Sequence, residues 1–382
     1  MKEEPLEPGS ASGADRKSQQ PSFIRRRSFL QGLGVSSAML LPTTLLADRD
    51  DRRKKLPRGD VAILRFLAAA ELIESDLWEQ YNELGGVKGG NAAYQLALEN
   101  LDSDMPQYIA DNTDDERSHA AFLNAYLESR GDQPVNLDAF RMLPSSQATG
   151  AKQKGRLTNL MNLNVDTSWY TRYRSEENPD FGATFPQAVH IVGEPAIPVD
   201  DADTPPGMMQ PPVPVTHQQR RMQAIANTAG FHFAFIEQGG SSLYTIMSLK
   251  VTSLEVLRIV VSIGGTEVNH FAVWHDKAGN AVNVTDPETG VTFPDLNAPP
   301  FGGEEFQTNL IFPEPCDFLK GEKLPPCSVI RPSLDQNGGA VATIKALTEG
   351  GLFLGQSGGF FAAAMELANA ADAAHRERFD ED

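Results

Sequence analysis

Two short motifs of glutamate and histidine carry the chemistry of this chain. Each is a Glu-x-x-His quartet, and each follows an isolated glutamate that stands seven residues before a tyrosine. The residues that make up the two sets are Glu74, Tyr81, Glu116 and His119, and then Glu237, Tyr244, Glu267 and His270. Positions i and i+3 share one face of a helix, so the carboxylate and the imidazole of a quartet can bind the same metal ion. Together the two sets offer four carboxylates and two imidazoles, which suits two metal ions.

These residues fall in four segments with the apolar periodicity of helices, at about 60–84, 105–130, 217–249 and 253–277. Each candidate ligand lies on or beside the apolar stripe of its helix. An ionised glutamate that faces a core is strongly destabilising unless a partner compensates its charge. The last two segments carry few basic residues near Glu237 and Glu267, which disfavours pairing with arginine. A shared pair of cations is the better explanation, and oxygen-rich ligation with one imidazole per metal indicates two iron or two manganese ions.

The four segments predict a mainly α fold, a four-helix bundle over residues 60–278. About 85 residues at 131–216, rich in proline, glycine and aromatic residues, form a long crossover between helices two and three. We interpret its aromatic residues Trp169, Tyr170 and Tyr173 as packing residues. Residues 279–382 are predicted to be a loop-rich C-terminal extension that ends in a helix.

The first helix offers alternatives for its ligand. Glu71 and Glu79 are also present, but the seven-residue step to Tyr81, which Glu237 and Tyr244 repeat, favours Glu74. Tyr81 and Tyr244 are either catalytic residues, which hydrogen-bond a ligand carboxylate across the site or donate an electron, or plain core residues.

Glycine pairs also flank two of the candidate ligands, at 239–240 and 264–265. A glycine inside a helix costs about 1 kcal/mol relative to alanine. The pairs therefore indicate either open space for O2, peroxide or a small substrate, or close helix packing.

The composition limits the partners of this protein. The chain has 33 basic and 51 acidic side chains and a net charge of −18. Such a charge disfavours nucleic acid and anionic membrane surfaces as partners. A homo-oligomer is compatible with the sequence.

The N-terminal region has the pattern of an export signal. Residues 1–20 are polar and expected to be disordered. Arg25-Arg26-Arg27-Ser28-Phe29-Leu30 then precedes an apolar run at 32–47, and a charged cluster follows. This pattern is typical of a twin-arginine signal peptide that ends near residue 47. We expect the twin-arginine machinery to export the protein to the periplasm or beyond, whereas an uncleaved signal would anchor it in the membrane.

Cys316 and Cys327 are the two cysteines of the chain. An exported protein meets an oxidising environment, so we predict a disulfide that closes a proline-rich loop. The alternative is two free thiols.

The chain resembles the ferritin-like superfamily, in particular its bacterioferritin and exported ferritin-like branches. The resemblance covers about 60–130 and 217–277, and its six-ligand pattern matches this sequence at Glu74, Glu116, His119, Glu237, Glu267 and His270. It implies a bundle that binds two iron or manganese ions and reacts with O2 or peroxide. The long crossover and the C-terminal extension would obstruct a hollow storage cage, which disfavours iron storage.

Two functions follow from these expectations. The first is a dimetal oxidoreductase, such as an oxidase, a peroxidase or a catalase-like enzyme. The second is a non-enzymatic metal-binding or stress-protection protein in which the metals hold the four helices together.

Overall fold

The computed structural model describes residues 55–173, 185–205, 214–301 and 338–377, together with the backbone of two strands at 310–312 and 327–329. The predicted export signal lies outside these residues, and so do the side chains of Cys316 and Cys327. The signal and the disulfide therefore stay predictions. Within the described part, no helix is both long enough and apolar enough to cross a membrane.

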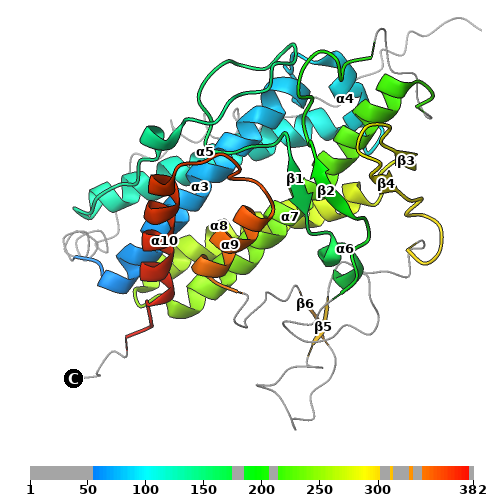
Figure 1. Cartoon of the computed structure of the whole chain (residues 1–382). Coiled ribbons are helices and arrows are strands. Elements are labelled where there is room, and N and C mark those ends of the chain that lie inside the picture. Colours follow the sequence, from blue (N-terminus) through cyan, green and yellow to red (C-terminus); the bar gives the residue numbers. More distant parts are fainter. Residues whose placement is uncertain are drawn as a thin grey trace, which may run out of the picture. The chain divides into compact units, whose positions relative to one another are not determined.

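Four long helices make up the bundle (Figure 1). They are α3 (Arg58–Gly85), α5 (Met105–Ser129), α7 (His217–Lys250) and α8 (Leu254–Ala278), with the short α4 (Ala92–Glu99) between α3 and α5. The closest pairings are α3 with α5 and α7 with α8. The mainly α fold and the four helices that the periodicity predicts are confirmed.

Polar side chains fix the start of α7 and the turn that precedes α8. Thr216 and Gln219 form a capping box at the start of α7, in which each side chain bonds the other residue's backbone. Asp60, at the start of α3, accepts hydrogen bonds from the backbone N–H groups of Thr252 and Ser253, both at 2.8 Å. Asp60 therefore ties the short turn between α7 and α8 to the beginning of α3.

The crossover between α5 and α7 contains a 3-10 turn, η2 (Asp138–Phe140), the helix α6 (Ser168–Tyr173), and the antiparallel strands β1 (Leu163–Val165) and β2 (Ile191–Glu194). The buried Asp76 of α3 anchors it: the carboxylate accepts the backbone N–H groups of Leu157 and Thr158 at 2.9 and 3.0 Å. Arg141 also donates to Asp76, at 2.6 Å. These bonds hold the crossover along α3.

The aromatic residues of α6 pack on the bundle, which confirms their interpretation as packing residues. The rings of Trp169 and Tyr173 lie 6.1 and 4.8 Å from the ring of Phe271 on α8. Tyr170 stacks on His275, with ring centroids 5.7 Å apart. The crossover thus closes over α8 through aromatic contacts.

The C-terminal region adds short strands and two helices. The strands pair as antiparallel hairpins, β3 (Val284–Thr285) with β4 (Thr292–Phe293) and β5 (Leu310–Phe312) with β6 (Cys327–Val329). Helix α9 (Ala340–Glu349) contacts α7, and α10 (Gly358–Asp372) packs against α3 and α9. The predicted terminal helix corresponds to α10, whereas α9 is an element that the sequence did not predict.

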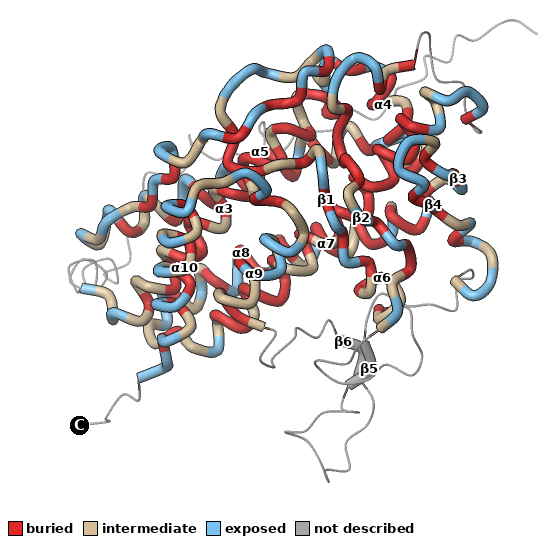
Figure 2. The backbone as a smooth tube through the Cα atoms, viewed as in Figure 1, coloured by how far each residue is buried: buried red, intermediate tan, exposed pale blue. Residues whose placement is uncertain are grey.

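The core of the bundle runs between the four long helices, where buried positions recur along each helix (Figure 2). It includes a layer of stacked aromatic rings. Trp78 of α3 lies 4.8 Å from Phe233 of α7 and 5.4 Å from Trp274 of α8. The indole of Trp274 donates a hydrogen bond to the side-chain oxygen of Asn112 on α5, at 2.8 Å. The aromatic layer is therefore linked by this hydrogen bond to a buried polar side chain of α5.

Candidate metal centre

Six buried side chains from all four long helices meet inside the bundle. They form two groups of four, and within each group one ligand atom per residue lies within 4.8 Å of the others. We call them together the metal-centre cluster: Glu71, Glu116, His119, Glu237, Glu267 and His270. Glu116 and Glu267 belong to both groups. Two adjacent sites that share two carboxylates are the arrangement of a carboxylate-bridged dimetal centre.

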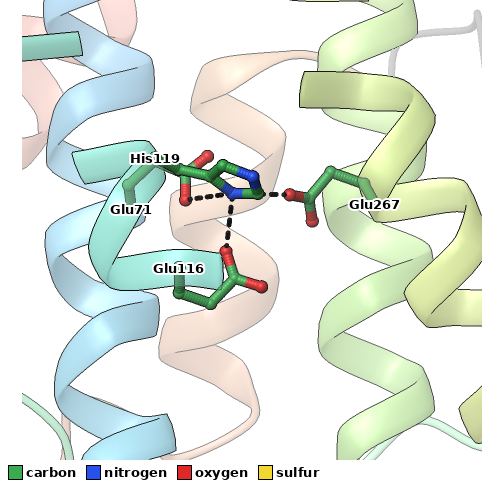
Figure 3. A group of neighbouring side chains, drawn as sticks. All are labelled: Glu71, Glu116, His119 and Glu267. Atoms are coloured by element: carbon green, nitrogen blue, oxygen red, sulfur yellow. Dashed lines mark hydrogen bonds and ion pairs between the residues drawn. The ribbon is translucent and has the colours of Figure 1, made fainter. Parts of the chain in front are cut away.

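Each histidine directs its Nδ1 atom at several carboxylates. The Nδ1 of His119 lies 3.1 Å from Glu116 and 3.4 Å from both Glu71 and Glu267 (Figure 3). The Nδ1 of His270 lies 3.1 Å from Glu116 and 3.3 Å from Glu237. The i, i+3 spacing of the first quartet therefore brings its carboxylate and imidazole together. In the second quartet, His270 instead contacts carboxylates of α5 and α7, and Glu267 belongs to the same group of ligand atoms.

On the first helix, Glu71 belongs to one of these groups in place of the predicted Glu74. Among the described residues, Glu74 belongs to neither group, although it is close enough for the charges of Glu267 and Glu116, after burial, to raise its pKa well above the ordinary value. The two glutamates are three residues apart, so both lie near one face of α3. The rotation of α3 decides between them, and a periodic pattern does not fix that rotation.

Tyr81 is also placed differently from the prediction. Its hydroxyl lies 2.7 Å from the Nδ1 atom of the buried His232, and it bonds no member of the metal-centre cluster among the described residues. Glu71 has its own aromatic residue seven positions on, Trp78. That spacing is a signal for Glu71 in the sequence, but the identity of Tyr81 pointed to Glu74 instead.

Tyr244 does contact the cluster. Its hydroxyl donates a hydrogen bond to Glu71 from across the bundle. Both alternatives left open for the tyrosines therefore occur: Tyr244 orients a carboxylate of the cluster, and Tyr81 is a core residue.

Two further side chains position the cluster. The amide of Asn112 donates to Glu116 at 2.7 Å and to Glu237 at 3.0 Å, and its own oxygen accepts from Trp274. Asp115 lies 3.1 Å from the Nε2 atom of His270. A partner on the second ring nitrogen fixes the orientation of a metal-binding imidazole. Sequence reasoning missed both, although a polar Asn112 on an apolar stripe was a visible signal.

The glycine pairs divide between the two interpretations. A Cβ atom at Gly240 would lie 2.5 Å from the carboxylate of Glu267, and one at Gly264 would lie 2.8 Å from Tyr244. These two glycines permit close packing around the cluster. At Gly239 and Gly265, by contrast, an added Cβ meets nothing within 4 Å in the described structure.

The cluster without a metal is electrostatically unfavourable. Burial, and then the charge of Glu237, raises the pKa of Glu116 to about 7. Burial and the charge of Glu116 raise the pKa of Glu267 well above its ordinary range. Burial alone would lower the pKa of His119, but the nearby carboxylates of Glu116 and Glu267 raise it above the ordinary value. The imidazoles thus take protons when nothing else compensates the carboxylates.

Several atoms of the cluster have no hydrogen-bond partner within the described part of the chain. They are Glu71 Oε2, Glu237 Oε2, both carboxylate oxygens of Glu267 and His270 Nδ1. Unpaired polar atoms of this kind, buried together, are expected where a cation binds. Among the described residues no lysine or arginine pairs with these carboxylates. The donor set therefore fits two divalent cations, which would balance four negative charges.

Fold and site together define a class of protein, the helix bundles whose inward-facing glutamates and histidines can hold metal ions. A family model for the ferritin-like domain matches residues 59–280, which is more than half of the chain. The protein therefore belongs to the ferritin-like family. The comparison with curated proteins found no match, and neither did the comparison with solved structures.

Proposed function

We propose that this protein holds two iron or two manganese ions in the metal-centre cluster and uses them to react with O2 or peroxide. Glu116 and Glu267 would bridge the ions, because they alone belong to both groups of ligands. Glu71 with His119 would complete one site, and the remaining pair would complete the other. When bound, such ions supply redox and Lewis-acid chemistry.

The observation that carries this proposal is the set of unpaired buried atoms in the cluster. Tyr244, Asn112 and Asp115 hold three of the carboxylates and one imidazole in fixed orientations, yet four carboxylate oxygens and one imidazole nitrogen make no hydrogen bond within the described part of the chain. Hydrogen bonds that orient ligands while leaving their metal-facing atoms open are typical of a preorganised site.

Elemental analysis of the purified protein tests the proposal. We expect about two iron or manganese ions per chain. Glu116→Ala and Glu267→Ala should each lose them, whereas Asp111→Ala, an exposed carboxylate on the same helix as Glu116, should keep them. A protein without metal, or with metal that neither substitution removes, would overturn the dimetal function.

A second pair of variants tests the assignment of the first helix. Glu71→Gln should lower the metal content, because Glu71 lies in a ligand group, and Glu74→Gln should leave it unchanged. The reverse result would restore the assignment that the sequence favoured.

A structural role for the metals is the second candidate function. One observation favours it: the cluster draws residues from all four long helices, so bound ions would link α3, α5, α7 and α8. This role predicts a large loss of thermal stability on chelation and no turnover of O2 or peroxide by the metal-loaded protein. Turnover that Glu267→Ala abolishes would decide in favour of the enzyme.

We also propose that the protein is exported through the twin-arginine machinery. The support is the sequence pattern at 25–47, with its arginines followed by Phe29 and Leu30. Replacement of both Arg26 and Arg27 by lysine should keep the protein inside the cell, as cell fractionation would measure. Unchanged export would contradict the proposal.

A further inference from the structure

A cavity of about 440 Å³ lies beside the metal-centre cluster. Helices α3, α7 and α9 line it together with α6 of the crossover. Its walls are mostly aliphatic and aromatic, and they include Phe66 and Ile73 of α3, Leu243 of α7, Trp169 of α6 and Ile344 of α9. A volume in this range, with mainly apolar walls and some polar groups between them, is typical of sites for small organic molecules.

The cavity reaches the edge of the cluster at the glycine pair of α7. Gly239 and Gly240 both line it, and so does Glu74. The backbone at Gly240 packs directly on Glu267, since a Cβ there would come within 2.5 Å of that carboxylate. A molecule in the cavity would therefore lie next to a carboxylate that both metal sites share.

Gly239 has no comparable packing reason. An added Cβ at this position would meet nothing within 4 Å, so a larger residue would extend into the cavity. Glycine in a helix interior is destabilising by about 1 kcal/mol relative to alanine. Its presence here keeps the cavity open beside the cluster.

The polar groups of the cavity indicate what it can bind. Glu74 places a half-buried carboxyl in the wall next to the carboxylates of the cluster, which disfavours an anionic ligand near the metal edge. Arg172 also lines the cavity, but it lies over the ring of Tyr173 and donates to the hydroxyl of that residue. Other polar side chains of the walls bond one another: Gln187 donates to Asp166 at 2.7 Å, and Gln238 donates to Ser242 at 2.8 Å. The remaining lining residues are mainly apolar, so a neutral molecule suits the site better than a charged one.

We propose that this cavity binds a neutral, mainly apolar organic molecule, of about one or two rings in size, beside the dimetal centre. The position of that molecule beside bound metals rests on the proposed function. Its binding in the cavity does not, because residues of the chain alone form the walls.

Fluorescence titration with N-phenyl-1-naphthylamine, a neutral apolar dye, tests the proposal on the purified protein. We expect saturable binding that Gly239→Leu weakens by about tenfold or more, because the leucine fills the cavity. Gly265→Leu is the matched control: it too replaces a helix glycine in open space, but at an exposed position of α8 away from the cavity. The affinity of this control variant for the dye should stay within about twofold of the wild-type value. Absence of saturable binding, or equal weakening by both variants, would overturn the proposal.

A second variant guards against a local disturbance of α7. Ala342→Phe fills the cavity from the opposite wall, on α9, and should weaken dye binding as Gly239→Leu does. Unchanged affinity in both cavity variants would show that the dye binds elsewhere, which would also overturn the proposal.

A separate measurement tests whether a molecule in the cavity lies beside the metal ions. The fluorine relaxation of 4-fluoroaniline should be faster with manganese-loaded protein than with zinc-loaded protein, and Gly239→Leu should remove the difference. Relaxation that the metal does not change would overturn the placement beside the centre.

Dye binding by a protein that takes up neither iron nor manganese would contradict the proposed function and leave binding in the cavity standing. Metal uptake without dye binding would overturn the cavity proposal alone.

Discussion

In the described part of the chain, buried carboxylates gather at two places, and the chain compensates them differently. The first place is the metal-centre cluster. The second, which we call the arginine cluster, consists of Arg221 with Glu194, Asp203 and Asp286. There the guanidinium of Arg221 lies 2.9 Å from Asp203, 2.7 Å from Asp286 and 3.4 Å from Glu194. The arginine cluster contains its own cation.

The two clusters also differ in how many of their buried carboxylate oxygens have hydrogen-bond partners. Among the described residues, no carboxylate oxygen of the arginine cluster is buried without a partner, whereas four carboxylate oxygens of the metal-centre cluster are. Thr289 bonds Glu194, and backbone N–H groups bond Asp286 and Asp203. A group of buried acids therefore indicates a metal only where the chain leaves its atoms unpaired.

The largest effect that we expect is at Arg221. Arg221→Met removes the one cation of the arginine cluster and leaves buried acids uncompensated, which should lower the free energy of unfolding by about 3–5 kcal/mol. Urea unfolding measures this loss. Arg117→Met, which breaks an exposed pair with Glu79, is the control and should change stability by about 0.5 kcal/mol or less. A loss below about 1 kcal/mol at Arg221 would remove the contrast between the clusters.

The next effect concerns pH in the metal-free protein. The pKa of Glu116 is about 7 in the folded state, against an ordinary value of 4.5, because of burial and the charge of Glu237. The folded state then binds more protons than the unfolded state, so stability should fall as the pH rises from 4.5 to 7, by on the order of 3 kcal/mol. Burial lowers the pKa of His119, but the nearby carboxylates of Glu116 and Glu267 raise it by more, and the resulting stabilisation is lost as the pH rises above 6.5.

Bound metal should reverse that dependence. Carboxylates and imidazoles bind a metal only when deprotonated, so the metal-loaded protein should gain stability over the same range of pH. Thermal unfolding between pH 5 and 8, with and without a chelator, measures both slopes. Parallel curves would show that the metal-centre cluster, like the arginine cluster, is compensated within the chain.

The sequence was informative about the metal-centre cluster for a physical reason. Its members lie on the apolar stripes of regular helices, so local periodicity predicted the four helices and five of the six side chains that meet. The choice between Glu71 and Glu74 depended on the rotation of α3, which tertiary packing sets. The arginine cluster was not predicted, because Glu194, Arg221 and Asp286 come from a crossover strand, a helix and a C-terminal loop that no local pattern relates.

The two tyrosines sharpen the limits of that prediction. Tyr244→Phe removes the hydroxyl that bonds Glu71 and should weaken metal affinity by about 10–100-fold. Tyr81→Phe is the matched control, because its hydroxyl contacts His232 and should leave metal affinity unchanged. Competition with a chelator of known affinity measures both. If Tyr81→Phe weakened metal binding as much as Tyr244→Phe, the first helix would have to be rotated towards Glu74.

The smallest effect returns to the arginine cluster. Burial, and then a hydrogen bond with Asp286, raises the pKa of Glu194 to about 8, so this carboxyl is largely protonated at neutral pH. Glutamine mimics a neutral carboxyl, and Glu194→Gln should change stability by about 1 kcal/mol or less at pH 6. The wild type should lose stability as the pH rises from 4.5 to about 8, because the unfolded carboxyl ionises before the folded one, so the variant should become relatively more stable over this range. Urea unfolding at pH 6 and 9 measures the difference. A variant that loses stability relative to the wild type at pH 9 would mean that Glu194 is ionised and paired with Arg221.

The same substitution at Glu267, Glu267→Gln, should abolish metal binding, because there the negative charge of the carboxylate balances a bound metal ion and not a side chain of the protein.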